Sequence, residues 1–173
     1  MYSDSNYENN KIANIYVALD NIRSAQNVGS FFRTCDSLGV DKIFLCGITS
    51  VPPNKEILKT ALGATESVKW EHFENTSKCI ETLKKKGFTI ICIEQTEKSL
   101  MLDKYEFNID ENICLVFGNE IEGVSKEIIE MANDCVEIPQ LGTKHSLNVS
   151  VAGGIVIWDL LSRKLRKNYK KLI

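Results

Sequence analysis

The chain has 173 residues, of which 43% are hydrophobic and 25% are charged, which excludes a disordered or fibrous protein and fits one globular domain. Its 21 basic and 23 acidic residues leave a formal net charge of -2, so the overall charge does not predict a polyanion partner, and any such partner must meet a local basic surface. We expect a short polar arm over residues 1–11 and a single domain over residues 12–173.

In chain order, hydrophobic periodicity and turn residues predict an alternation of strands and helices. Strands are expected at residues 14–19, 42–46, 66–73, 88–95, 113–118 and 135–139, and helices at residues 24–38, 56–62, 76–86, 125–132 and 146–167. The runs FTIICIEQ and ICLVFG are continuously apolar, as in strands that are buried on both faces of a parallel sheet. The sequence therefore predicts a doubly wound α/β domain, whose ligand site lies beyond the carboxyl ends of its strands.

Cysteine usage and the chain start indicate the compartment. The six cysteines lie far apart, form no C-x-x-C pair and sit mostly in apolar runs such as FLCG and ICLVF. We expect buried free thiols in a reducing compartment, without disulfides and without a metal site. The start MYSDSNYENNK lacks the apolar core of a signal peptide, and the longest apolar run, residues 149–161, is too short to span a bilayer. We therefore expect a cytoplasmic protein that does not contact membranes.

Three polar stretches with glycines follow predicted strands or begin predicted helices: NIRSAQNVGSFFRT, VFGNEIEGVS and IPQLGTKHSLNVS. We expect them to form one site. A plainer interpretation stays open, in which Ser146 caps the last helix and the glycines only form turns. A hydrolase is not predicted, because Ser146 and His145 are adjacent and no G-x-S-x-G elbow is present. GNEIEG matches neither phosphate-binding glycine pattern, so nucleoside triphosphate chemistry is not predicted either.

Taken in order, NVGSFFRTCDSLGV, LVFGNEIEGVS and EIPQLGTKHSLNVSVAGG resemble motifs 1, 2 and 3 of the SpoU/TrmH family of the SPOUT superfamily. Members of that family are RNA ribose 2'-O-methyltransferases that use S-adenosylmethionine. The resemblance runs from about Ile15 to Leu165. It implies an α/β fold with a mostly parallel sheet, helices on both faces and a C-terminal trefoil knot, although knots are rare in general.

The resemblance implies a set of cofactor-binding residues. Gly118 would let the backbone approach the cofactor closely, and Ile138 and Leu147 would enclose the adenine. In the plainer interpretation the two apolar side chains belong to the core. Leu115 and Gly142 occupy further matching positions.

The catalytic residues that the resemblance implies are Arg33, Asn27, Glu120, Ser146 and Asn148. In family members the arginine matching Arg33 has been assigned as general base. A guanidinium stays protonated in proteins, however, and stabilisation of a developing oxyanion would explain equally well why an arginine is essential there. Glu120 is expected to pair with Arg33. Asn148 is expected to position the ribose or its phosphate, and Ser146 to line the pocket.

The final helix is expected to form the interface of a homodimer, because its apolar residues occupy too much of its circumference for one core to cover. They are Val151, Ile155, Val156, Trp158, Leu160 and Leu161. Gly153 and Gly154 would allow close packing there.

The chain end is basic, and we expect a stripe along the last helix to contact RNA phosphates. The stripe consists of Arg163, Arg166, Lys167, Lys170 and Lys171. A plain solvated helix end, whose cations suit the helix dipole, is the alternative.

The sequence thus predicts an S-adenosylmethionine-dependent methyltransferase that acts on the ribose 2'-hydroxyl of structured RNA, either tRNA or rRNA. Two alternatives stay open. The first is an inactive RNA-binding module of the same fold, and the second is a methyltransferase for a base nitrogen, against which the form SLNVSVA of motif 3 argues.

Overall fold

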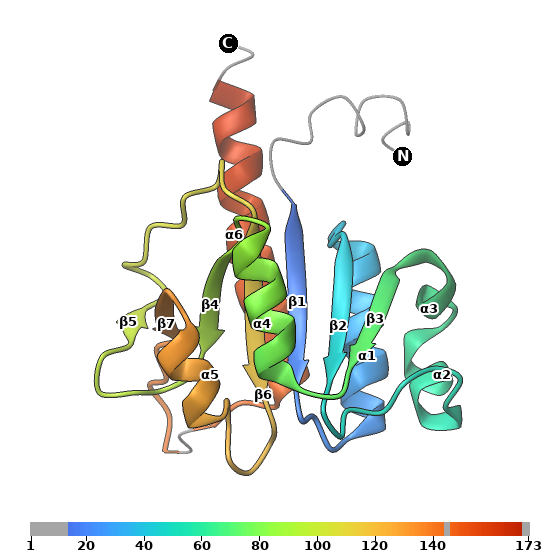
Figure 1. Ribbon diagram of the computed structural model, residues 1–173. Coiled ribbons are helices and arrows are strands. Elements are labelled where there is room, and N and C mark those ends of the chain that lie inside the picture. The colour runs from blue at the N-terminus through green and yellow to red at the C-terminus, as the bar shows by residue number, and fades with distance from the viewer. Residues whose placement is uncertain (1–13, 144–145, 171–173) are drawn as a thin grey trace.

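The computed structural model describes residues 14–143 and 146–170, with side chains up to residue 167; the predicted polar arm and His145 lie outside these residues. Seven parallel strands form one sheet in the order β3-β2-β1-β6-β4-β7-β5 (Figure 1). The strands are β1 Ile15–Asp20, β2 Lys42–Cys46, β3 Lys69–Phe73, β4 Thr89–Ile93, β5 Leu100–Met101, β6 Ile113–Gly118 and β7 Asp134–Glu137. The predicted parallel α/β sheet is confirmed.

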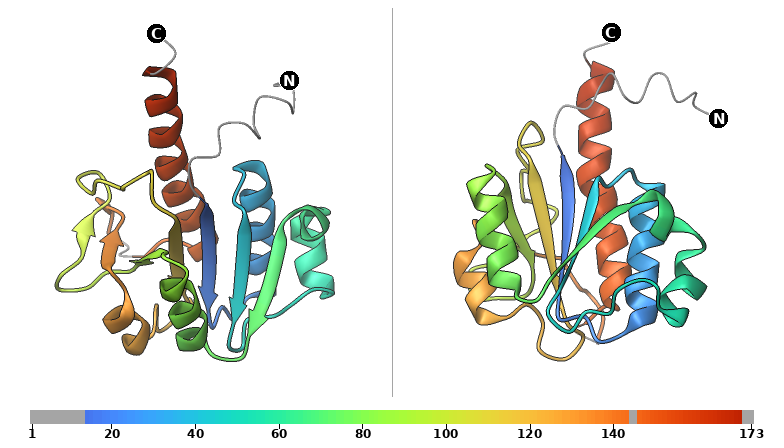
Figure 2. Two further views of the ribbon diagram at one scale, coloured as in Figure 1. Left: turned by 45° about the horizontal axis from the view of Figure 1, so that its top comes forward. Right: turned by 45° about the vertical axis from the view of Figure 1, so that its right-hand side comes forward.

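Helices cover both faces of the sheet (Figures 1 and 2). One face carries α1 Ala25–Ser37, α2 Lys55–Ala61, α3 Ala64–Ser67 and α6 Val149–Lys170, and the other carries α4 Thr76–Lys85 and α5 Lys126–Met131. Strand β6 shows why both faces need cover, because all six of its residues are buried. Leu115 and Phe117 face the cluster under α1 and α6, whereas Cys114 and Val116 face the cluster under α4. The trefoil knot that the family resemblance implies stays a prediction.

Helix α6 begins three residues later than predicted, because an asparagine side chain caps it. Asn148 Oδ1 accepts hydrogen bonds from the backbone N–H of Ser150 at 2.9 Å and of Val151 at 3.4 Å. These N–H groups have no partner within the first turn of a helix, so a side-chain acceptor stabilises the helix start. The predicted start at Ser146 was wrong, and the plainer interpretation in which that serine caps the helix does not hold.

Helix α6 packs on α1 within the same chain. A Cβ atom at Gly153 would lie 2.3 Å from Cε1 of Phe31, so the missing side chain permits this contact. Val156 and Leu160 are fully buried in the same cluster. Gly153, Val156 and Leu160 therefore complete the core of this chain. The dimer interface expected on α6 stays a prediction and concerns the apolar residues of the helix that remain exposed.

The cysteines are free, as predicted, and five of the six are buried. Burial is the main cause that raises the pKa of Cys35, Cys92 and Cys114, so these thiols stay neutral. Within residues 14–143 and 146–170 no group of three or more His, Cys, Asp or Glu side chains could hold a metal ion. No described helix is long and apolar enough to cross a membrane.

Arg163 fastens α6 to the loop that follows β5. Its guanidinium donates hydrogen bonds to Asp159 Oδ2 at 2.8 Å, to the Tyr105 carbonyl at 2.7 Å and to the Leu102 carbonyl at 3.1 Å. The same group lies over the Phe107 ring, 5.6 Å from its centre. Three of its five N–H donors are thus used inside the protein, and its expected RNA contact stays a prediction.

The other four residues of the predicted basic stripe differ in their surroundings. Lys167 forms an ion pair with Asp110 in the loop before β6. Arg166 is exposed and stays a predicted RNA contact. The side chain of Lys170 and the whole of Lys171 lie outside the described residues.

Substitution of Arg163 by alanine is expected to lower the free energy of unfolding by about 2 kcal/mol, because two loop carbonyls and a carboxylate lose a charged donor. Urea denaturation followed by circular dichroism measures the change. The exposed Arg166 is the matched control, and Arg166→Ala should leave the transition midpoint near that of the wild type. Coincident midpoints for Arg163→Ala and Arg166→Ala would contradict the structural role.

Candidate functional site

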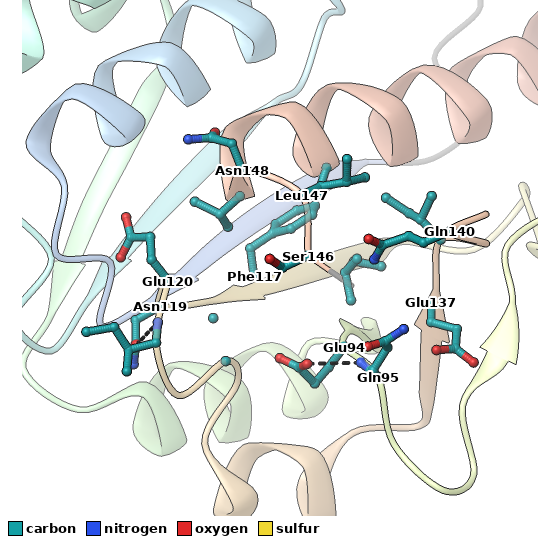
Figure 3. A pocket seen from close by; sticks show the side chains of 17 residues that line it. Glu94, Gln95, Phe117, Asn119, Glu120, Glu137, Gln140, Ser146, Leu147 and Asn148 are labelled. Carbon is teal, nitrogen blue, oxygen red and sulfur yellow. Dashed lines mark hydrogen bonds between the residues drawn. The ribbon is translucent and has the colours of Figure 1, made fainter. Parts of the chain in front are cut away.

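A cavity of about 460 Å³ opens beyond the carboxyl ends of β4, β6 and β7, where the α/β fold predicts a ligand site (Figure 3). The segment that leads into α6 closes one side of it. Its lining consists of Ile93, Glu94, Gln95, Phe117, Gly118, Asn119, Glu120, Ile121, Gly123, Glu137, Ile138, Gln140, Ser146, Leu147, Asn148, Val149 and Ala152. All three sequence motifs either line this cavity or contact its lining.

Gly118 ends β6 where the following loop folds back against it. A Cβ atom there would lie 2.0 Å from both the carbonyl carbon of Gly123 and the nitrogen of Val124. Asn119 and Gly123 exchange two backbone hydrogen bonds, of 3.1 and 3.0 Å, which close the loop. No other residue fits at Gly118 without moving the loop. The glycine thus permits a close approach between two backbone segments, whereas the close approach to a cofactor that the sequence led us to expect stays a prediction.

Two carboxylates from neighbouring strands fasten the far end of this loop. Glu94, directly after β4, accepts the N–H of Val124 at 2.8 Å. Asp20, the last residue of β1, accepts the N–H of Ser125 at 2.9 Å. The motif 2 loop is therefore held from both sides of β6.

A chain of hydrogen bonds joins the three motifs. Asn148 Nδ2 donates to Asn27 Oδ1 at 3.1 Å, and Asn27 Nδ2 donates to Glu120 Oε1 at 2.7 Å. The directions are fixed, because Asn148 Oδ1 is already the acceptor that caps α6. Asn148 must then donate through Nδ2, Asn27 must accept through Oδ1, and Glu120 must be an acceptor.

Glu120 also accepts two backbone N–H groups at the start of α1. They belong to Arg23, at 3.2 Å, and Ser24, at 3.3 Å. Desolvation by partial burial acts to raise the pKa of Glu120, but the hydrogen bonds from Asn27 and the backbone outweigh it and lower that pKa below its ordinary value. Glu120 is thus a carboxylate at neutral pH that ties motif 2 to motif 1.

The predicted pairing of Glu120 with Arg33 was wrong. Arg33 is exposed on α1, does not line the cavity, and forms no ion pair among the described residues. Asn27 and Arg33 lie six residues apart on one helix, which places them about 120° from each other around its axis. Asn27 faces Glu120, and Arg33 lies on a different side of α1.

Ile138, Leu147 and Ser146 line the cavity together with Gly118, as their predicted roles require. Two predicted cofactor residues do not. Leu115 is fully buried inside the sheet. Gly142 is exposed, and a Cβ atom added there would meet no other atom within 4 Å.

The sequence interpretation missed five polar residues of the lining: Glu94, Gln95, Asn119, Glu137 and Gln140. Glu94 and Gln95 lie outside the three motifs, whereas Asn119, Glu137 and Gln140 lie within motifs 2 and 3 but were given no role. A signal was nevertheless available, because Glu94, Gln95 and Glu137 end or directly follow apolar strands of a parallel sheet, where ligands bind.

These observations define a doubly wound α/β protein with a cavity for a nucleotide-sized ligand at the carboxyl edge of a parallel sheet. The chain belongs to the SpoU rRNA Methylase family, whose model matches residues 14–158.

Two curated relatives illustrate the similarity. The chain is 31% identical over 156 residues to the 23S rRNA (guanosine-2'-O-)-methyltransferase RlmB of Neisseria meningitidis serogroup B, covering 90% of this chain and 61% of that protein. It is 35% identical over 142 residues to an uncharacterized tRNA/rRNA methyltransferase of Borreliella burgdorferi, covering 82% and 61%. The chain thus spans 61% of the length of both relatives.

Solved structures agree with the fold. An AdoMet-bound rRNA methyltransferase from Sinorhizobium meliloti matches with a TM-score of 0.81 and 27% identity, over 87% of this chain and 56% of that chain. A TrmH/SpoU tRNA modifying enzyme of A. aeolicus matches with a TM-score of 0.81 and 26% identity, over 95% and 85%.

Proposed function

We propose that the protein transfers a methyl group from S-adenosylmethionine to the ribose 2'-hydroxyl of a structured RNA, either tRNA or rRNA. The observation that carries the proposal is the hydrogen-bond chain from Asn148 through Asn27 to Glu120, which joins three distant motifs beside one cavity. The relatives named for RNA ribose and tRNA/rRNA methylation support it. Such substrates, together with free thiols, suit the cytoplasm.

The lining of the cavity fits this cofactor in size, polarity and charge. A volume of about 460 Å³ lies in the range of small-molecule sites. Phe117, Ile138 and Leu147 offer apolar walls for an adenine, and Glu94 and Glu137 place carboxylates where a cation can bind. When bound, the cofactor supplies a methyl group on a positively charged sulfur that an oxygen can attack.

A group of the protein must stabilise the negative charge that develops on the ribose oxygen. The ribose hydroxyl is a weak acid, so methylation requires such stabilisation. We assign this task to Arg33, a permanent cation that is exposed on α1 and can also bind an RNA phosphate.

The two asparagines and Glu120 act differently in this proposal. Asn148 and Asn27 each use both ends of the side-chain amide inside the protein, and Glu120 accepts three N–H donors. These three residues hold the motifs at fixed positions relative to one another. For Asn148 this structural role replaces the direct contact with the ribose that the sequence led us to expect.

Transfer from S-adenosylmethionine labelled in its methyl group to total RNA tests the function. Digestion of the RNA to nucleosides should yield the label in 2'-O-methylnucleosides. Label in a methylated base would instead favour the base-nitrogen enzyme. RNA that is bound but never labelled would favour the inactive binding module.

We also propose that the protein is a homodimer through α6. Val151, Ile155 and Trp158 remain exposed, at 51%, 39% and 54%. Their spacing of four and three residues places them on one face of the helix. An apolar stripe of this kind on a soluble chain is typical of a subunit contact.

Introduction of a charge into this stripe should separate the subunits. We expect Trp158→Glu to sediment with the mass of one chain, while the wild type sediments with twice that mass, because a buried unpaired carboxylate is strongly unfavourable. Trp70, which is 36% exposed on β3, provides the matched control, and Trp70→Glu should remain dimeric. A monomeric wild type with full activity at micromolar concentration would refute the dimer.

A further inference from the structure

The described lining of the cavity is acidic. It includes the carboxylates of Glu94, Glu120 and Glu137, and no lysine, arginine or histidine is found among the described residues that line it. A sulfonium cation in such a cavity is attracted by each carboxylate, and the attraction is stronger than in bulk water because the walls exclude part of the solvent. Glu94 and Glu120 differ, however, in how firmly they are held and in what they face.

Glu94 is the carboxylate that the protein fixes inside the cavity. It is half-buried, and Figure 3 shows its side chain on the floor of the cavity beside Gln95. One oxygen accepts the N–H of Val124 at 2.8 Å and the other accepts the N–H of Gln95 at 3.0 Å. A Cβ atom at Gly123 would lie 2.1 Å from Oε2, so the loop leaves room for this carboxylate.

Glu120 is less suited than Glu94 to attract a cation in the cavity. It is exposed, and its two oxygens are directed at three donors near the start of α1. An oriented, half-buried charge needs little rearrangement when a ligand binds, so its full attraction is available to the ligand. Glu94 meets this condition.

We propose that Glu94 makes the cofactor site selective for the positively charged methyl donor over its neutral product, S-adenosylhomocysteine. This inference rests on the proposed function. During transfer the bond from sulfur to the methyl carbon breaks, a bond from that carbon to the ribose oxygen forms, and the hydroxyl proton leaves to solvent. The sulfonium becomes a neutral thioether, while the rest of the cofactor keeps its charges. The attraction to Glu94 is therefore lost at that step, and the product is released more easily.

The test compares dissociation constants of the full-length protein for donor and product, measured by isothermal titration calorimetry without RNA. Glu94→Gln removes the charge and keeps the shape. We expect it to weaken donor binding about tenfold and product binding by less than about twofold, where tenfold corresponds to about 1.4 kcal/mol. Glu97→Gln, an exposed glutamate three residues further along the chain, should change neither constant.

Loss of a loop contact in Glu94→Gln must be separated from loss of charge. Glu94→Asp retains the charge on a shorter side chain, and it should preserve the ratio of the two dissociation constants even if both rise. Equal weakening of donor and product in Glu94→Gln, or no change in either, would overturn the inference. A wild-type protein that does not bind the donor would overturn the proposed function itself.

Discussion

Replacement of Arg33 by alanine is expected to lower the rate of RNA methylation by about 100-fold or more, the scale for a group that stabilises developing charge. The affinity for the cofactor should stay unchanged, because Arg33 does not line the cavity. Arg33→Lys should also be poor, since a lysine keeps the charge but loses the planar fork that binds a phosphate or oxyanion through two N–H groups.

Single-turnover methylation and calorimetric cofactor binding, measured on the same preparations, check this expectation. Lys85→Ala removes an exposed cation from α4 on the other face of the sheet and serves as the control, with a rate near that of the wild type. A wild-type rate in Arg33→Ala would remove the residue from the mechanism.

Replacement of Gly118 by alanine should have an effect of similar size, but on binding as well as on turnover. The added Cβ atom would lie 2.0 Å from backbone atoms of Gly123 and Val124, and backbone atoms cannot move aside as a flexible side chain can. The loop must shift, and it carries Glu120 and one wall of the cavity. A displacement of about 1 Å near reacting groups can cost about 100-fold in rate.

Gly142→Ala is the matched control, because a Cβ atom at Gly142 would meet nothing within 4 Å. Both variants add one methyl group, so a difference between them reports the close approach at Gly118. Calorimetry should find no measurable cofactor binding for Gly118→Ala and a wild-type constant for Gly142→Ala. A wild-type constant for Gly118→Ala would show that the loop does not shape the cofactor site.

The strands and long helices could be predicted because their local patterns agree with their packing. The continuous apolar run of β6 is buried on both faces, and Gly39 follows α1 with the positive φ of 67° that ends the helix. Strand β5 was missed, since two residues, Leu100 and Met101, are too short to show a period. Helix α3 was missed for the same reason, and its last residues were assigned to the strand that follows.

The site was predicted as a set of motifs but not as a set of contacts. The motifs converge because they follow neighbouring strands, whereas the partner of Glu120 depends on which face of α1 meets the loop. Asn27 lies on the face of α1 that contacts Glu120. The spacing of Asn27 and Arg33 does not reveal which of the two lies on that face. Likewise, only the packed structure shows that Asn148 rather than Ser146 caps α6.

Methylation of ribose by this protein can be tested by a comparison of 2'-O-methylated nucleotides in RNA from cells with and without it. We expect 2'-O-methylation to disappear at one or a few sites in tRNA or rRNA of cells that lack the protein, and we expect the wild-type chain, but not Arg33→Ala, to restore it. An unchanged pattern of ribose methylation in cells that lack the protein would contradict the proposed function.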